Sequence, residues 1–164
     1  MESCLESVFI EMFIEGRFIA VIGCVYRPPN SNYSDFLLHM NNILLLCDPY
    51  KGNLLIAGDF NLNLLQFESD ENINSFLNVI LQFKLSFTVF APTRITSHSA
   101  TLIGNILTNF SLSLLSVNII LYDISDHLSE IVVILQDHAQ LINSLFSALL
   151  LPCSLLHTHC NACY

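Results

Sequence analysis

Basic residues are scarce in this sequence. Lysine and arginine together number 5, against 14 aspartate and glutamate residues, so the formal net charge at pH 7 is −9. Proteins that bind nucleic acid without sequence preference use clustered Lys and Arg to neutralise phosphates, and a chain this acidic repels a polyanion except where its few cations or a bound metal meet it. The composition therefore excludes nonspecific nucleic-acid binding through a basic face.

A secretory signal is also missing. The first residues, MESCLESVFIEMFIEGR, contain four glutamates where a signal peptide has positive charge followed by an unbroken apolar run. The apolar stretch most relevant to a membrane, residues 139–156, contains Pro152 and several polar residues, and it falls short of the roughly 20 predominantly apolar residues that span a bilayer. We therefore expect an intracellular protein, with a membrane-associated protein held by residues 139–156 as the disfavoured alternative.

Tryptophan is absent and charged residues make up only 12% of the chain, whereas hydrophobic residues make up 53%. That much apolar surface offsets the conformational entropy lost on folding, which argues against intrinsic disorder. A chain of 164 residues has room for one domain with one core. We therefore expect one folded domain.

Apolar runs alternate with polar segments along most of the chain. Two runs between residues 8 and 26 flank Glu15-Gly16, the pattern of a hairpin, and helical spacing predicts amphipathic helices over residues 36–47 and 73–81, with Ser34 or Asn32 as the first N-cap. Further strands are predicted over residues 54–57, 85–90, 101–107, 115–121 and 128–135. This alternation of strands and helices predicts an α/β or mixed two-sheet sandwich.

Beyond Gln136 the strand pattern stops. Apolar residues there fall on one helical face, namely Leu141, Ile142, Leu145, Phe146, Leu149 and Leu150. We therefore divide the chain into a domain over residues 1–135 and a hydrophobic helical tail over residues 136–164. Near the end of the tail, His157, His159, Cys160 and Cys163 are possible zinc ligands, although a second properly spaced pair is lacking.

Three polar clusters stand at the mouths of predicted strands: YRPPN from Tyr26, GDFN around Asp59, and SDH ending at His127. Asp59 and Asn61 are two residues apart and would point the same way, so the carboxylate could bind a hard cation or hold a water while the amide contacts the same substrate group. Asp126 and His127 point in different directions, which allows one to ligate a metal while the other faces a phosphoryl oxygen. This combination suits metal-assisted attack of water on phosphorus.

Each of these residues also has a purely structural interpretation. Asp59 could cap a helix or close a turn, Asp126 and His127 could be an ordinary loop pair, and Tyr26 could pack its ring at a strand end. The three clusters together favour a site over these alternatives.

The motifs YRPPN, LLIAGDFN, PTRIT, SATLIGNILTN and ISDH occur in the order and at spacings of the endonuclease/exonuclease/phosphatase superfamily. The sequence most resembles the endonuclease domains of non-LTR (LINE-type) retrotransposons, from about Val8 to Leu135. The resemblance implies a four-layer α/β sandwich, in which two mixed β-sheets lie face to face with helices outside. It also implies Mg²⁺ as cofactor, and hydrolysis of DNA phosphodiester bonds as the ancestral reaction.

The resemblance implies roles for five residues near the reacting phosphate. Tyr26 matches the tyrosine that contacts the scissile phosphate, and Asp59 and Asn61 match the pair that orients or deprotonates the attacking water. Asp126 matches a metal-associated carboxylate, and His127 matches the histidine that faces the phosphate. These are the expected catalytic and metal-binding residues.

The resemblance also implies a DNA contact. Arg94 and Thr96 lie in the loop that shapes this contact in such endonucleases. DNA is therefore the implied partner, bound weakly or not at all by a chain of net charge −9, and a protein acting on it would be nuclear.

Two departures from the family pattern concern catalysis. Gly104 stands where the family has the aspartate that orients the catalytic histidine, and removal of a comparable carboxylate costs about 10⁴ in rate in the serine proteases. The family's N-terminal half, with an early asparagine and the metal-binding glutamate, would precede Met1. We therefore expect a partial sandwich and a truncated, inactive relative with weakened Mg²⁺ binding.

A non-catalytic role is the alternative. A sandwich without part of its strands exposes sheet edges, which favour self-association or pairing with another protein. The chain could then serve as a protein-interaction module.

Overall fold

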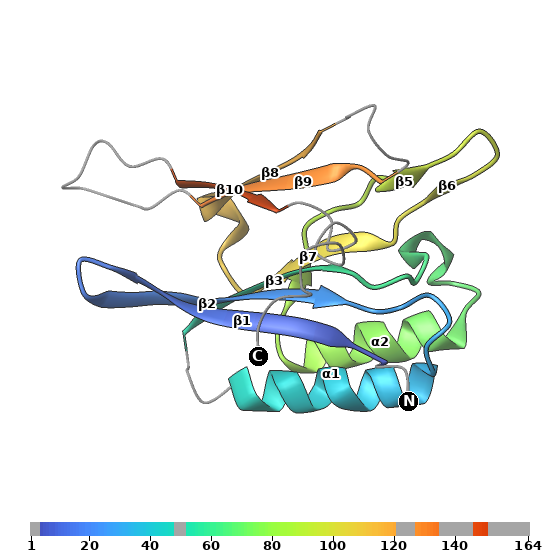
Figure 1. Ribbon diagram of the computed structural model, residues 1–164, viewed down its shortest axis with the longest axis horizontal. Coiled ribbons are helices and arrows are strands. Elements are labelled where there is room, and N and C mark those ends of the chain that lie inside the picture. The colour runs from blue at the N-terminus through green and yellow to red at the C-terminus, as the bar shows by residue number, and fades with distance from the viewer. Residues whose placement is uncertain (1–3, 48–51, 121–126, 135–145, 151–164) are drawn as a thin grey trace, which may run out of the picture.

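A computed structural model describes residues 4–47, 52–120, 127–134 and 146–150 of the chain (Figure 1). The described strands form a five-stranded sheet in the order β1-β2-β3-β7-β4, a three-stranded sheet in the order β10-β9-β8, and a ribbon of β5 and β6. In chain order the elements are β1 (Glu6–Ile14), β2 (Arg17–Tyr26), α1 (Tyr33–Cys47), β3 (Asn53–Asp59), η2 (Leu64–Gln66), α2 (Glu71–Gln82), β4 (Ser86–Phe87), β5 (Arg94–Ile95), β6 (Ala100–Thr101), β7 (Gly104–Thr108), η3 (Leu112–Leu114), β8 (Leu115–Ile120), β9 (Ser129–Ile134) and β10 (Phe146–Leu150).

The chain begins with the predicted hairpin. β1 and β2 pair antiparallel from Glu6↔Tyr26 to Ile14↔Arg17. The two turn residues, Glu15 and Gly16, have φ values of 50° and 75°, and positive φ at both positions is the requirement of the tight turn whose twist matches that of paired strands. The prediction of a hairpin around Glu15-Gly16 is confirmed.

Both predicted helices are present, each with a side-chain cap at its start. Asn32 Oδ1 accepts a hydrogen bond of 3.1 Å from the backbone N–H of Asp35 before α1, and Asp70 Oδ1 accepts from the N–H groups of Asn72 and Ile73 at the start of α2. Such caps satisfy backbone donors that a helix leaves unpaired. Both helices lie against the same face of the five-stranded sheet (Figure 1).

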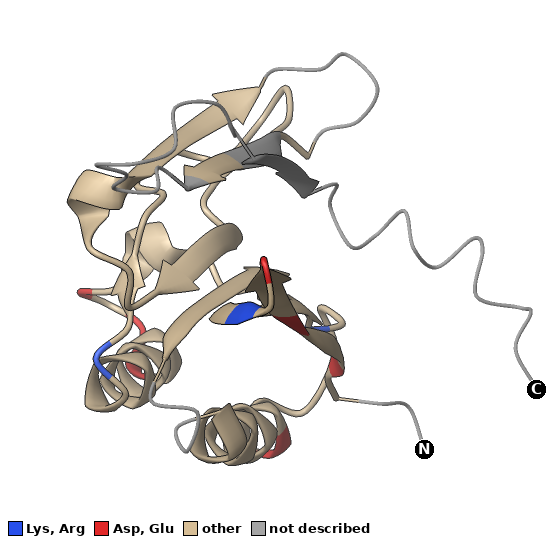
Figure 2. Cartoon of the chain, turned by 90° about the vertical axis from the view of Figure 1, so that its left-hand side faces the viewer, with Lys and Arg blue, Asp and Glu red and all other residues tan. Residues whose placement is uncertain are grey.

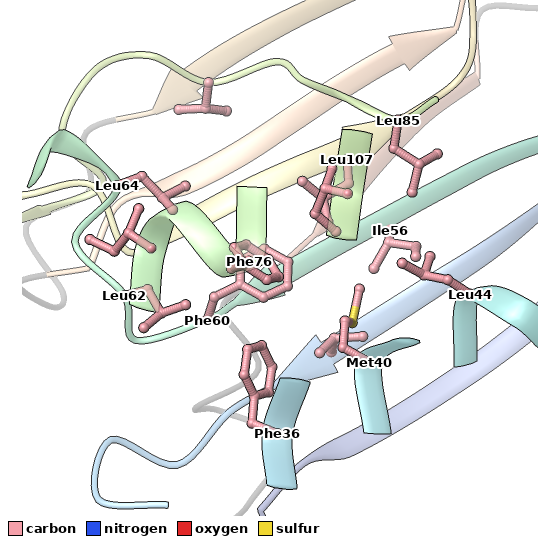
Figure 3. Close-up of a cluster of buried hydrophobic side chains, with 14 of the residues drawn as sticks. Phe36, Met40, Leu44, Ile56, Phe60, Leu62, Leu64, Phe76, Leu85 and Leu107 are labelled. Atoms are coloured by element: carbon pink, nitrogen blue, oxygen red, sulfur yellow. The ribbon is translucent and has the colours of Figure 1, made fainter. Parts of the chain in front are cut away.

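Phe76 occupies the centre of the core between the helices and the sheet (Figure 3). Its ring lies 5.6 Å from that of Phe36 in α1 and 5.1 Å from that of Phe60, which follows β3. The ring of Phe87 in β4 meets it edge-on at 6.1 Å. One side chain of α2 thus joins α1, the end of β3 and the edge strand β4.

The other face of the five-stranded sheet packs against the second sheet. Ala20, Leu55, Ala57 and Ile106 form a cluster with Val132 of β9. β3 is therefore covered on both faces, as the uninterrupted apolar run 54–57 predicts. The structure confirms the mixed α/β architecture of facing sheets with helices outside. The described residues form three layers, which are the helices α1 and α2, the five-stranded sheet and the three-stranded sheet.

The C-terminal prediction was wrong for residues 146–150. They form β10, which pairs antiparallel with β9 from Phe146↔Ile134 to Leu150↔Glu130, where the sequence predicts a helix. A short apolar run fits either element by periodicity, and the open edge of β9 supplies hydrogen bonds that an isolated helix end lacks. The remaining tail, including the possible zinc ligands His157, His159, Cys160 and Cys163, lies outside the described residues.

Two predicted strands are shorter than expected because side chains replace ladder hydrogen bonds. The strand predicted over residues 85–90 stops at Phe87. The N–H of Thr88 still reaches the carbonyl of Ile106 in β7 over 3.1 Å, but Asn105 Oδ1 accepts from the N–H of Val89 over 3.2 Å. The strand predicted over residues 101–107 is interrupted where Asn63 Oδ1 accepts from the N–H of Leu102. No described helix is long and apolar enough to cross a membrane.

Replacing Phe76 with alanine should destabilise the fold. Its ring is fully buried, at 0% exposure, so Phe76→Ala removes apolar burial and leaves a cavity, which costs about 3–5 kcal/mol. Phe90→Ala is the matched control, because Phe90 is 77% exposed and surface changes are usually worth within about 0.5 kcal/mol. Denaturant unfolding measures both, and equal losses would contradict the assignment of Phe76 to the centre of the core.

Candidate active site

Three of the implicated positions lie side by side across the five-stranded sheet. Tyr26, the last residue of β2, is the parallel partner of Asp59, and Asp59 is the antiparallel partner of Gly104. Directly paired residues project to the same face of a sheet. Here that face also carries Leu55, Ala57 and Ile106 of the cluster between the two sheets, so the row opens toward the second sheet.

His127 reaches this row from the segment just before β9. Its Nδ1 lies 3.6 Å from Oδ2 of Asp59, and the side chains of His127 and Asp59 are 20% and 7% exposed. The backbone at His127 bridges to Arg94 of β5, and the N–H of Leu128 donates to the carbonyl of Thr93 over 2.8 Å. These backbone contacts with the segment at Thr93 and Arg94 hold His127 next to Asp59 at the end of β3.

Burial controls the protonation of the two oxygen groups in this row. It raises the pKa of Asp59, while the hydrogen bond from the N–H of Asn61 and the charges of His127 and Arg94 act in the opposite direction. Burial, Asp59 and Glu6 raise the pKa of Tyr26. At neutral pH the Tyr26 phenol therefore keeps its proton and remains a hydrogen-bond donor.

Asn61 lies in a tight turn just after β3. Its φ is 47°, its N–H donates to Asp59 Oδ1 over 3.1 Å, and its Nδ2 donates to the carbonyl of Arg27 over 2.7 Å. β3 ends at Asp59, so the two-residue alternation expected to align the side chains of Asp59 and Asn61 does not extend to Asn61. The amide nitrogen is directed to the end of β2, and its expected contact with substrate stays a prediction.

Gly58 permits the close approach of β2 and β3 beside the site. A Cβ there would lie 2.7 Å from the carbonyl oxygen of Val25 and 2.9 Å from Cζ of Phe60. Both contacts are closer than a real Cβ makes. Any larger residue before Asp59 would therefore clash with β2 and with the ring of Phe60.

The two residues expected to contact DNA have different surroundings. Arg94 is exposed on β5, and its charge acts on Asp59, so the fold brings it to the site. Thr96 is in the turn between β5 and β6, where its Oγ1 accepts from the N–H groups of His98 and Ser99 and contacts Ser99 Oγ at 2.9 Å. The Thr96 side chain thus stabilises the turn that carries it, and the DNA-binding roles of both residues stay predictions.

The described part of the chain does not hold a metal-binding group. No three His, Cys, Asp or Glu side chains come together there in a way that could bind a metal ion. Magnesium prefers several oxygen ligands, and among the described residues this row supplies the Asp59 carboxylate, with one oxygen bonded to Asn61 and the other facing His127. Asp126, the expected metal ligand, lies outside the described residues, so we assign no step to the metal.

Sequence reasoning assigned no role to two buried residues that hold the site together. Thr93 Oγ1 accepts from the N–H groups of Ile103 and Gly104, and the side chain of Arg27 donates to the carbonyls of Phe60 and Asn61. Thr93 lies in PTRIT and Arg27 in YRPPN, so the motifs contained them. Their function depends on contacts between distant segments, which a motif does not reveal.

The raised pKa of Asp59 predicts how stability varies with pH. A carboxyl whose pKa is raised on folding stabilises the protein at pH below its ordinary value, and this contribution is lost as the pH rises through the folded-state pKa. Asp59→Asn keeps the acceptor for the Asn61 N–H and removes the buried charge. Its free energy of unfolding should exceed that of the unchanged chain at pH 7, with the difference shrinking toward acid pH. Urea titrations across pH 4–8 measure this, and a less stable variant at pH 7 would contradict it.

Comparison with known proteins places the chain in a family. A family model described as endonuclease-reverse transcriptase matches residues 20–131, more than half of the chain, while no curated protein matches. Among solved structures, the chain is similar to the endonuclease domain of TRAS1, a telomere-specific non-LTR retrotransposon, with 17% identity and a TM-score of 0.64. The similarity covers 79% of this chain and 61% of that domain, and at this identity it concerns the fold. On the family match, the chain belongs to the endonuclease-reverse transcriptase family.

Proposed function

We propose that this chain descends from an endonuclease that hydrolyses DNA phosphodiester bonds with Mg²⁺, and that its own turnover is lost. The observation that carries the proposal is the row of Tyr26, Asp59 and Gly104 beneath His127. It combines groups suited to phosphate-ester chemistry with a glycine at the position where the family has the carboxylate that orients its histidine.

Three side chains would act on a phosphate placed over this row. Hydrolysis adds the oxygen of a water to phosphorus and breaks one phosphorus–oxygen ester bond. The protonated phenol of Tyr26 would donate to a phosphate oxygen, and the carboxylate of Asp59 would orient or deprotonate the water. The imidazole of His127 would face the phosphate and stabilise its developing negative charge.

Gly104 is the reason to expect that turnover fails. A carboxylate at position 104 would project from β7 to the same face as Asp59 and could accept from a nitrogen of His127, which fixes the tautomer and orientation of an imidazole. With glycine at 104, Asp59 Oδ2 is the carboxylate oxygen facing His127 Nδ1 at 3.6 Å. Asp59 must then both orient the imidazole of His127 and orient or deprotonate the attacking water, and it does each less effectively than a dedicated carboxylate would.

Charge argues that contact with DNA is weak. The whole chain has five Lys and Arg residues, and those in the described part are scattered over the molecule and do not gather on one face (Figure 2). Of these, Arg94 lies beside the site. A DNA contact through Arg94 and the turn at Thr96 would therefore be local, and acting on DNA would place the chain in the nucleus.

Magnesium enters the proposal through the family. When bound, Mg²⁺ would neutralise charge on the phosphate and the leaving oxygen. Asp126 is the residue of this chain that we expect to hold it, with weakened affinity.

Plasmid nicking by Gly104→Asp tests the proposed loss of turnover. The unchanged chain with Mg²⁺ should nick supercoiled plasmid no faster than the same protein in EDTA. Gly104→Asp should raise the nicking rate by up to about 10⁴, the effect of an orienting carboxylate in a serine protease. Gly104→Asn is the matched control, because it adds similar bulk without the charge.

Two outcomes would count against this proposal. Nicking by the unchanged chain that requires Mg²⁺ and disappears in His127→Ala would show that turnover is retained. Folded Gly104→Asp with no gain over Gly104→Asn would refute the argument from histidine orientation.

A second candidate function is a protein-interaction module. β1 is an edge strand of the five-stranded sheet, and its Val8, Ile10 and Phe13 are 57%, 59% and 54% exposed. A pocket of about 490 Å³ lies beside it, with Phe9 and Ile10 of β1 and Ile43 and Leu46 of α1 among its lining residues. An exposed apolar edge strand is a ready site for pairing with another strand.

The size of the purified protein in solution distinguishes the module from a mere remnant. A discrete complex of defined stoichiometry, measured by size-exclusion chromatography with light scattering, supports the module. Ile10→Lys should then dissociate it, because a charged side chain on an edge strand opposes strand pairing. Phe90→Lys changes a still more exposed apolar residue, at 77% against 59% for Ile10, away from β1, and should leave the complex intact. Heterogeneous soluble aggregate, or a monomer, would contradict the module.

A further inference from the structure

Arg27 is a buried arginine held by carbonyl oxygens. It is 6% exposed, a condition that charged side chains rarely adopt without a partner. We find no ion pair between it and a carboxylate among the described residues. Its Nη1 donates to the carbonyls of Phe60 and Asn61 at 3.4 and 3.1 Å, and its Nη2 donates to the carbonyl of Ser31 at 3.0 Å.

These carbonyls belong to two different connections. Ser31 lies between β2 and α1, whereas Phe60 and Asn61 follow β3. A guanidinium group is planar and presents its N–H donors in a rigid fork, so it fixes the distance and direction between the groups it bonds. A lysine at the same place would supply one compact charge without that fork.

Aromatic rings fix the guanidinium itself. Its Cζ lies 5.4 Å from the ring centre of Phe36 and 6.0 Å from that of Tyr33. Both rings belong to α1, and Phe36 is fully buried in the main core. A cation over aromatic faces is attracted to them, so the fork is anchored to the helix layer and not to solvent.

The backbone of Arg27 holds the same turn as its side chain. Its N–H donates to the carbonyl of Asp59 over 2.9 Å, and its carbonyl accepts from Asn61 Nδ2 over 2.7 Å. Asn61 has a φ of 47°, a left-handed conformation that Asn adopts more readily than most residues with a Cβ, and its side chain is tied to Arg27 in this conformation. Arg27 therefore forms hydrogen bonds with all three residues of this turn, namely Asp59, Phe60 and Asn61.

This turn sets the direction of the Asp59 carboxylate. The N–H of Asn61 donates to Asp59 Oδ1 over 3.1 Å, which leaves Oδ2 directed to His127. If the turn relaxed, the Asn61 N–H would move away from Oδ1, and the carboxylate would be free to rotate. A chain of contacts therefore runs from α1 through Arg27 and the turn to Asp59.

We propose that Arg27 is a positioning residue, whose guanidinium fork locks the turn at residues 59–61 and so aims the Asp59 carboxylate at His127. The catalytic meaning of this proposal rests on the proposed function. The locking of the turn does not, and it is measurable in a chain without turnover.

Amide hydrogen exchange by NMR tests the locking directly. Arg27→Lys keeps the positive charge and loses the fork, so the Asn61 amide should exchange at least about tenfold faster than in the unchanged chain. The Leu54 amide, which donates to Asn109 Oδ1 at the other end of β3, should be unaffected. Arg17→Lys is the matched control, because Arg17 is exposed at the start of β2. Unchanged exchange at Asn61 in folded Arg27→Lys would overturn the proposal.

The unchanged chain provides a second test if Arg27→Lys does not fold. The Asn61 amide should then respond to added urea as strongly as the most protected amides of β3, because a locked turn opens only on global unfolding. Exchange at Asn61 that is independent of urea, while the β3 amides respond, would overturn the locking of the turn.

Activity separates this proposal from the proposed function. If Gly104→Asp gains nicking activity, adding Arg27→Lys should lower kcat by about tenfold or more with KM little changed, since Arg27 is itself buried and acts on the reaction through the orientation of Asp59. An unchanged kcat would overturn the positioning role while leaving the proposed function intact. If Gly104→Asp gains nothing, the argument from histidine orientation in the proposed function fails on that result, and the exchange measurement alone decides whether Arg27 locks the turn.

Discussion

The burial of β3 on both faces is the constraint on which the rest of the structure depends. Leu54 and Ile56 face the helices, while Leu55 and Ala57 face the second sheet. Because side chains alternate along a strand, Asp59 continues the row of Leu55 and Ala57 and is carried into the space between the sheets. The packing that stabilises the fold thus also places a carboxylate where water has little access.

A buried carboxylate requires partners, and those of Asp59 come from three separate parts of the chain. Asn61 supplies a backbone N–H from the adjoining turn, His127 approaches from the segment before β9, and Arg94 acts from the ribbon of β5 and β6. Burial still dominates and raises the pKa of Asp59. A second carboxylate at position 104 could accept a hydrogen bond from His127 in place of Asp59. With glycine at position 104, Asp59 is the carboxylate of this row that faces His127. This connects the electrostatics of the row with the proposed loss of turnover.

The parts of the fold that follow from local patterns were predictable. The Glu15-Gly16 hairpin, the two amphipathic helices and the buried strand at residues 54–57 are present at or near their expected bounds. Where the expectation was wrong, distant segments decided the outcome. The Asn105 side chain accepts from the N–H of Val89, beyond the early end of β4, and residues 146–150 form a strand on the edge of β9.

The sequence by itself determined the family, the order of the elements and the residue types at the strand ends, because motifs and periodicity are properties of neighbouring residues. Tertiary structure alone decided which of these residues meet. The alignment of Tyr26, Asp59 and Gly104 follows from strand register, and the bond from Arg27 to the carbonyl of Asn61 spans 34 residues. Such contacts form only when the sheet closes and buries the groups, since a hydrogen bond between distant segments has no signature in local sequence.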